Sequence, residues 1–127
     1  MIRYTDSVGG ITSEALCGFF VGWRTPRTPE EHLRILEGSD HVVIAIDDDR
    51  VIGFVTALSD GVQAAFIPLL EVLPEYQKRG IGTELVRRML ERLASIPCVD
   101  LTCDPKIQPF YARFGMHPAV GMIVRRG

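Results

Sequence analysis

Hydrophobic and polar residues alternate along this chain with two different periods, one typical of strands and one typical of helices. Runs rich in β-branched residues predict strands at 41–46, 51–58 and 64–73, and the polar turn at 47–50 joins the first two as a hairpin. From 82 to 95, apolar residues recur at helical spacing and charged residues fill the other face. This segment is therefore predicted to be an amphipathic helix.

The remaining elements are predicted from shorter signals. Thr28 is a suitable N-cap, Pro29 follows it in the first turn and Gly38 can end the helix that they begin. Pro68 removes one donor from the third strand, which indicates a bulge or an edge strand there. Four further segments are predicted: a short helix at 13–20, a strand at 98–103, a short helix at 107–114 and a last strand at 121–126.

The order of these elements is two helices, three strands, helix, strand, helix and strand. It describes a mixed α/β (α+β) domain whose sheet is covered by helices. A chain of 127 residues can bury one core, and no repeat or linker divides it. We therefore expect a single domain spanning residues 1–127.

Composition and charge exclude several classes of function. The formal net charge of -2 argues against nucleic acid or an anionic membrane as a partner. No apolar run approaches the length of a membrane span, and the first residues do not resemble a signal peptide, so we expect a cytoplasmic protein. The three cysteines and three histidines have no metal-ligand spacing, so no metal is expected.

The segment 71–83, EVLPEYQKRGIGT, places a glycine-rich turn between a predicted strand and a predicted helix. Such a turn exposes unpaired backbone N–H groups at the positive end of a helix dipole, which favours a phosphate or pyrophosphate. The Walker pattern requires a lysine after its second glycine, and the dinucleotide pattern requires a third glycine where this chain has Leu85. Neither pattern is present.

The motif that is present, Gln-x-x-Gly-x-Gly at 77–82 after Val72-Leu73-Pro74, resembles the signature of the GNAT superfamily of acetyl-CoA-dependent N-acetyltransferases. Residues 104–116 resemble the family's second motif, with Asp104 in place of a frequent Asn and Met116 in place of a frequent Phe. Short matches around Trp23, Asp60 and residues 71–77 are most similar to small bacterial members and to the plastid arylalkylamine (serotonin) acetyltransferase branch.

The resemblance implies a mostly antiparallel sheet that is splayed at the cofactor site and flanked by about four helices. It also implies acetyl-CoA as cosubstrate, a backbone N–H near Val72 that stabilises the oxyanion, and strand-like pairing of pantetheine with this segment. A homodimer with a contact at 122–126 is a further expectation from relatives. The residues expected to bind the cofactor are Val72, Leu73, Gln77, Lys78, Arg79, Gly80, Ile81, Gly82 and Thr83.

Acetyl transfer from a thioester to an amine requires a neutral amine, so a base is useful at neutral pH. Glu71 is the leading candidate because it is a carboxylate on an otherwise apolar strand just before the glycine-rich turn. Alternatively, Glu71 faces outward or orders the glycine-rich turn through backbone N–H groups. Asp60 is the second candidate for the base, and a water relay is a third solution.

Tyr111 is the candidate acid, since a phenol can donate a proton to the departing thiolate and the family's second-motif tyrosine often has that role. Its alternative role is aromatic packing. Trp23 is a candidate wall of the acceptor pocket, or it packs on the sheet. We expect an N-acetyltransferase for a small amine or a lysine side chain; the alternative is an acyl-CoA-binding regulatory module that transfers nothing.

Overall fold

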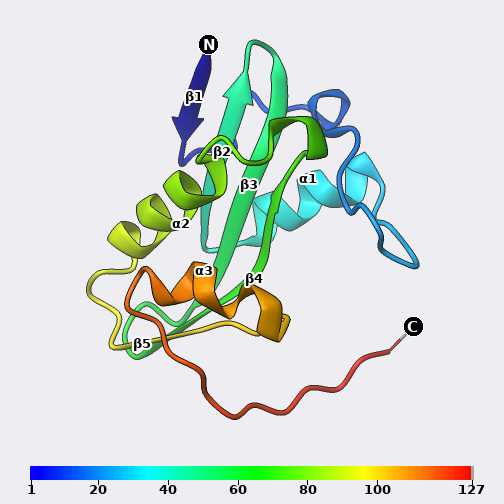
Figure 1. Cartoon of the computed structure of the whole chain (residues 1–127). Coiled ribbons are helices and arrows are strands. Elements are labelled where there is room, and N and C mark those ends of the chain that lie inside the picture. The colour runs from blue at the N-terminus through cyan, green and yellow to red at the C-terminus, as the bar shows by residue number, and fades with distance from the viewer. Residues whose placement is uncertain (127) are drawn as a thin grey trace.

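The computed structural model describes residues 1–126, in which one mixed sheet carries helices on both faces (Figure 1). Its strands are β1 (Ile2–Thr5), β2 (His41–Asp47), β3 (Arg50–Ser59), β4 (Ala64–Val72) and β5 (Cys98–Asp100). Its α-helices are α1 (Pro29–Gly38), α2 (Ile81–Arg92) and α3 (Gln108–Ala112). Short 3-10 helices cover Ser13–Leu16, Pro74–Tyr76 and Pro105–Ile107.

The five strands follow one another in the sheet in the order of the chain, from β1 to β5. All neighbours are antiparallel except β4 and β5, which run parallel. The sheet is thus mostly antiparallel, and the α/β class expected from the sequence is confirmed. The hairpin formed by β2 and β3 supplies its most buried strands, in which every residue from Val51 to Ala57 is buried.

Alternate residues of β3 face the two helical layers. The ring of Phe54 lies 5.3 Å from that of Phe19 and 4.4 Å from that of His32 in α1, so Phe54 faces the layer formed by α1. Gly53 faces the other side, where a Cβ atom would lie 3.2 Å from Leu85 of α2. The glycine therefore lets α2 pack closely on the sheet.

The two long helices begin in different ways. Thr28 caps α1 with a complete capping box: its hydroxyl accepts from the N–H of Glu31 at 3.1 Å, and Glu31 accepts from the N–H of Thr28 at 2.9 Å. This confirms the predicted start of α1. By contrast, α2 begins after Gly80 with no side-chain cap. Its first N–H groups are left for another partner.

Strand β4 contains the irregularity that Pro68 predicted. Thr56 pairs with Leu69 and Leu58 pairs with Phe66, so two residues of β4 lie opposite Ala57. This is a β-bulge, as expected. Beyond Phe66, the edge of β4 that faces away from β3 has no strand beside it among residues 1–126, because β5 pairs only with 64–66. The sheet is therefore splayed along the second half of β4.

The structure corrects three sequence predictions and adds one strand that was not predicted. The strand predicted at 121–126 is wrong, because these residues pair with no strand in the described chain and β-propensity alone cannot supply a partner. The strand β1 was missed, since its four residues gain their order from pairing with the distant β2. The helix expected at 13–20 is a 3-10 turn at Ser13–Leu16, and the strand expected at 98–103 ends at Asp100, where β4 diverges.

Candidate active site

The turn before α2 is held in a conformation that exposes backbone N–H groups. Gly80 has φ +81°, and Lys78, which is not a glycine, has φ +65°. The first helical bond is that from the N–H of Glu84 to the carbonyl of Gly80. The N–H groups of 81–83 precede it and have no partner within the helix, an arrangement that favours an anion. The sequence prediction of a bare helix start is confirmed.

Two side-chain contacts fix this turn to the rest of the molecule. The Gln77 side-chain amide donates to the carbonyl of Val72 at 3.0 Å, which ties the turn to the end of β4. The Arg79 guanidinium lies 5.0 Å from the centre of the Tyr76 ring, and the Tyr76 hydroxyl donates to Asp47 at 2.7 Å. That bond lowers the pKa of Asp47 and raises the pKa of Tyr76. The Gln77 side chain therefore holds the turn against the end of β4, and the Arg79 guanidinium lies beside the turn.

The end of β4 presents backbone groups to its open edge. The N–H of Leu73 donates to Ile52 of β3 at 2.9 Å. Because hydrogen-bonding direction alternates along an antiparallel strand, the N–H and carbonyl of Val72 point away from β3. The bond from Gln77 to the Val72 carbonyl agrees with this direction. Val72 can thus donate to a ligand, whereas Leu73 is fully buried and its N–H is already used.

Helix α3 joins the two sequence motifs. A Cβ atom on Gly82 would lie 3.8 Å from Phe110 of α3 and 3.9 Å from Val72 of β4. The Arg113 guanidinium also donates to the Thr83 hydroxyl at 2.8 Å. The start of α2, the end of β4 and α3 therefore meet at Gly82, so the glycine motif and the second motif belong to one site.

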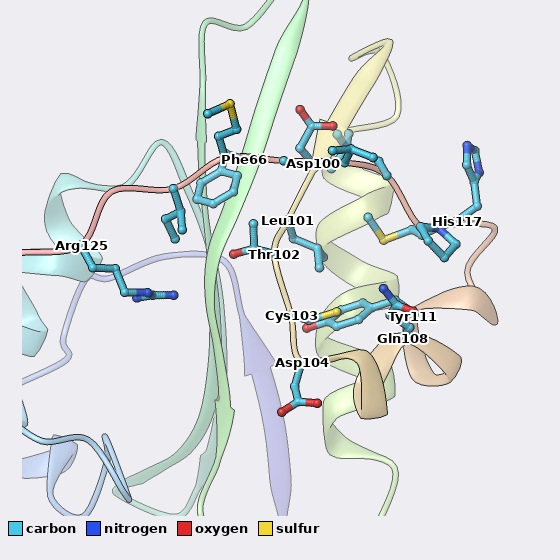
Figure 2. A pocket seen from close by; sticks show the side chains of 18 residues that line it. Phe66, Asp100, Leu101, Thr102, Cys103, Asp104, Gln108, Tyr111, His117 and Arg125 are labelled. Carbon is cyan, nitrogen blue, oxygen red and sulfur yellow. The ribbon is translucent and has the colours of Figure 1, made fainter.

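Tyr111 lines a cavity of about 710 Å³ between β4, the segment after β5, α3 and the segment 116–125 that follows α3 (Figure 2). Burial is the main cause that raises the pKa of its hydroxyl, and Cys103 beside it adds to the effect. The phenol therefore stays protonated at neutral pH and can donate a proton. Asp104, at the end of the same wall, accepts from the N–H of Lys106 at 2.9 Å and caps the short turn before α3.

Glu71 lies on the opposite side of β4 from Val72, facing the loop between the first 3-10 helix and α1. Its two carboxylate oxygens accept from the N–H of Phe20 at 2.9 Å and from the N–H of Val21 at 3.2 Å. Phe20 has φ +63°, a strained conformation for a residue with a side chain. Glu71 therefore orders the loop that contains Phe20 and Val21, whereas the sequence suggested the glycine-rich turn as the loop that it would order.

The two other candidate residues, Trp23 and Asp60, lie in different loops. Trp23 lies in the loop held by Glu71, is 47% exposed, and its ring centre is 4.9 Å from that of Phe20. Asp60 lies in the turn that enters β4, at the far end of that strand from Gln77. Its Oδ1 accepts from the backbone N–H groups of 62–64, and these bonds lower its pKa. They make Asp60 a weaker base and give it a structural role.

Three residues that contribute to the site were not identified from the sequence: Phe20, Cys103 and Arg113. Phe20 adopts positive φ without being a glycine, so no local signal marks it, although Gly18 and Gly22 on either side also have positive φ. Cys103 and Arg113 are ordinary residues whose roles depend on tertiary contacts. Among residues 1–126, no three His, Cys, Asp or Glu side chains gather as a metal site would require. None of the helices in this range combines the length and the hydropathy of a membrane span.

Comparisons with known proteins agree with this geometry. Residues 10–116 match the acetyltransferase (GNAT) family. A candidate acetyltransferase of Deinococcus radiodurans R1 has a crystal structure with TM-score 0.95 and 47% identity, over 98% of this chain and 88% of that one. A GNAT-family acetyltransferase of Streptococcus pneumoniae TIGR4 superposes with TM-score 0.79 at 27% identity, over 99% of this chain and 98% of that one.

An N-acetyltransferase of Pyropia yezoensis, itself described as uncharacterised, is 26% identical over 109 residues. The match takes in 80% of this chain but only 61% of that relative. This chain thus spans less than two thirds of the length of that relative.

Proposed function

The chain belongs to the GNAT acetyltransferase family, and we propose that it transfers the acetyl group of acetyl-CoA to a primary amine, carried by a small molecule or a lysine side chain. The observation that carries this proposal is the junction of β4 and α2. There, the turn at 73–80 joins a strand whose outer edge is open to an uncapped helix start. One site can therefore hold a pyrophosphate at the helix and an amide-containing arm along the strand.

The residues proposed to bind the cofactor fall into two sets, one for the pyrophosphate and one for the pantetheine arm. The N–H groups of 81–83 would bind the pyrophosphate, with Lys78 and Arg79 adding positive charge beside it. Ile81 has a buried side chain, so it contributes through its backbone. Val72 would pair with pantetheine through the open edge of β4. Leu73 supports this segment from the core.

The transfer itself requires a base, an oxyanion donor and an acid. The neutral amine attacks the thioester carbon, the Val72 N–H stabilises the oxyanion, and the carbon–sulfur bond then breaks. Tyr111 gives its proton to the leaving thiolate. Glu71 accepts the proton that the ammonium form of the amine loses before it attacks, directly or through water, because each of its oxygens keeps a lone pair beyond the bond to the loop. Trp23 would form part of the wall facing the acceptor.

Release of free thiol from acetyl-CoA tests the reaction. The purified chain is incubated with acetyl-CoA and a panel of arylalkylamines, polyamines, amino acids and lysine peptides. We expect amine-dependent thiol release with at least one class, together with a rise in melting temperature on addition of CoA. A chain that neither releases thiol nor gains stability with CoA would contradict the proposal.

A second candidate function is an acyl-CoA-binding module that performs no transfer. The observation that favours it is the engagement of both Glu71 oxygens by the loop, which is the arrangement of a purely structural carboxylate. This module would gain stability with CoA but release no thiol with any amine in the panel. The two measurements together therefore separate the two functions.

A further inference from the structure

Arg113 of α3 directs its guanidinium at the start of α2, where its partner is a neutral hydroxyl. Its Nη2 donates to the hydroxyl oxygen of Thr83 at 2.8 Å. Among residues 1–126, the Arg113 guanidinium takes part in no ion pair. Its positive charge is therefore not neutralised by a carboxylate of the described chain, although it lies beside a helix start that has no side-chain cap.

The Arg113 guanidinium is held in place by its own helix. It lies 5.1 Å from the centre of the Phe110 ring and 5.8 Å from that of the Phe114 ring. Its Nε donates to the Phe110 carbonyl at 3.5 Å, whereas its Nη1 has no hydrogen-bond partner in the part of the chain that the structure describes. Stacking on aromatic faces reduces the freedom of an arginine side chain, and a guanidinium with unused donors can bind a phosphate.

The same contact decides how the Thr83 hydroxyl can be used. A hydroxyl donates one hydrogen and accepts at two lone pairs. One lone pair of Thr83 accepts from Arg113, and within residues 1–126 the hydroxyl donates to no other group. Thr83 is the third residue of α2, and its N–H is one of the three that have no partner within the helix. The hydroxyl hydrogen is therefore available to the ligand that those N–H groups would bind.

We propose that Arg113 and Thr83 form a phosphate-binding pair for the pyrophosphate of CoA, an inference that rests on the proposed function. The Thr83 hydroxyl donates to a pyrophosphate oxygen, while Arg113 orients that hydroxyl and places a positive charge on the α3 side of the ligand. Lys78 and Arg79 lie in the turn before α2, so positive charge flanks the ligand from two elements. The alternative role of the contact is a tether that joins α3 to α2 and has no effect on the ligand.

Calorimetric titration of the intact chain with CoA tests the phosphate-binding pair without any amine acceptor. Arg113→Met and Thr83→Val should each raise Kd about tenfold, the low end for loss of a charge-assisted hydrogen bond. Thr83→Ser, which keeps the hydroxyl, should bind CoA as wild type does. Arg34→Met, which removes the same charge from the exposed surface of α1, should also bind as wild type does. Equal Kd values for wild type and Thr83→Val would overturn the pair alone, whereas a wild type that binds no CoA would overturn the proposed function with it.

The salt dependence of Kd separates a charge contact from a tether. The Kd of wild type for CoA should rise as the KCl concentration is raised, because salt screens exposed charges. In Arg113→Met this rise should be shallower, since one of the screened contacts is gone, and in Arg34→Met it should match wild type. If Arg113→Met weakens binding by the same factor at every salt concentration, the guanidinium acts only as a tether and the proposal is wrong.

Dephospho-CoA identifies the phosphate, because it keeps the pyrophosphate and lacks the 3′-phosphate of CoA. Arg113→Met should weaken the binding of CoA and of dephospho-CoA by the same factor. A loss that is confined to CoA would assign Arg113 to the 3′-phosphate and overturn its assignment to the pyrophosphate.

The double variant Arg113→Met, Thr83→Val tests whether the two side chains act together. Its loss of affinity should be smaller than the product of the two single losses, because both side chains act on one group of the ligand. Losses that multiply would show that the two residues act independently, and the pair would be rejected.

Discussion

The Glu71 carboxylate accepts a hydrogen bond of 2.9 Å from the backbone N–H of Phe20, a residue held at φ +63°. A side chain in this conformation costs about 1–3 kcal/mol and persists only where its surroundings hold it. A charge-assisted bond to the strained residue is worth about 1.5–3 kcal/mol. Glu71 therefore couples the strand that would bind acetyl-CoA to the loop that would face the amine.

Glu71→Gln tests whether this carboxylate also accepts a proton. If it does, kcat/KM at pH 7 should fall about a hundredfold, the lower end of what general base catalysis contributes. The deficit should shrink as pH approaches the pKa of the amine, because the neutral amine then needs no base. Steady-state kinetics from pH 6 to 10 measure both effects, with Glu37→Gln as the control. A deficit that is the same at every pH would assign Glu71 to loop positioning alone.

Gly82→Leu tests the proposed pyrophosphate site. A Cβ atom there would make only ordinary contacts, at 3.8 Å with Phe110 and 3.9 Å with Val72, but a longer side chain would fill the space between the helix start and α3. At about a hundredfold excess of CoA over Kd, wild type should gain roughly 10 °C in melting temperature. The variant should lose this gain while its own melting temperature changes little.

Two further variants test whether the loss of the CoA-induced rise in melting temperature requires a large side chain at residue 82. Gly82→Ala should keep most of the gain, because its methyl group fits. Gly38→Leu, at a glycine with no atom within 4 Å of a built Cβ, should respond to CoA as wild type does. Equal responses of Gly82→Leu and wild type would rule out a pyrophosphate at this helix start.

Tyr111→Phe tests the acid. Burial raises the pKa of this hydroxyl, so the group remains protonated across the neutral range and is available to the thiolate. Under conditions where chemistry limits the rate, kcat should fall about a hundredfold while the KM for acetyl-CoA changes little. Tyr4→Phe, on the remote strand β1, serves as the control. Unchanged turnover in Tyr111→Phe would remove this residue from the mechanism.

The residues that sequence reasoning placed correctly are those whose signal is local. The N-cap at Thr28 and the irregularity at Pro68 have signals in neighbouring residues of the sequence and are found as predicted. The contact between Glu71 and Phe20 joins residues 51 positions apart and has no local signature. The segment 121–126 shows the converse: its β-propensity is strong, yet a strand forms only where a second strand is present. Strand pairing and polar contacts between residues far apart in the sequence therefore could not be predicted from the sequence.

His32 should make the stability of the fold depend on pH. Its ring is completely buried on α1 against Phe54, at 4.4 Å between ring centres, and neither ring nitrogen has a partner in the described chain. Burial lowers its pKa from 6.5 to about 4. Between these values the unfolded chain binds a proton that the folded chain does not, so stability is complete above pH 6.5 and falls as the pH is lowered toward 4.

At pH 5 the resulting loss of unfolding free energy, relative to pH 7, is about 2 kcal/mol. His32→Leu keeps an apolar group of similar size in the cluster and removes the titration, so its stability should change between pH 7 and pH 5 by about 2 kcal/mol less than that of wild type. Urea unfolding at the two pH values measures this difference. His117→Gln, which alters an exposed histidine, should retain the wild-type dependence. If His32→Leu and wild type lose equal stability on acidification, the buried imidazole is not the group responsible.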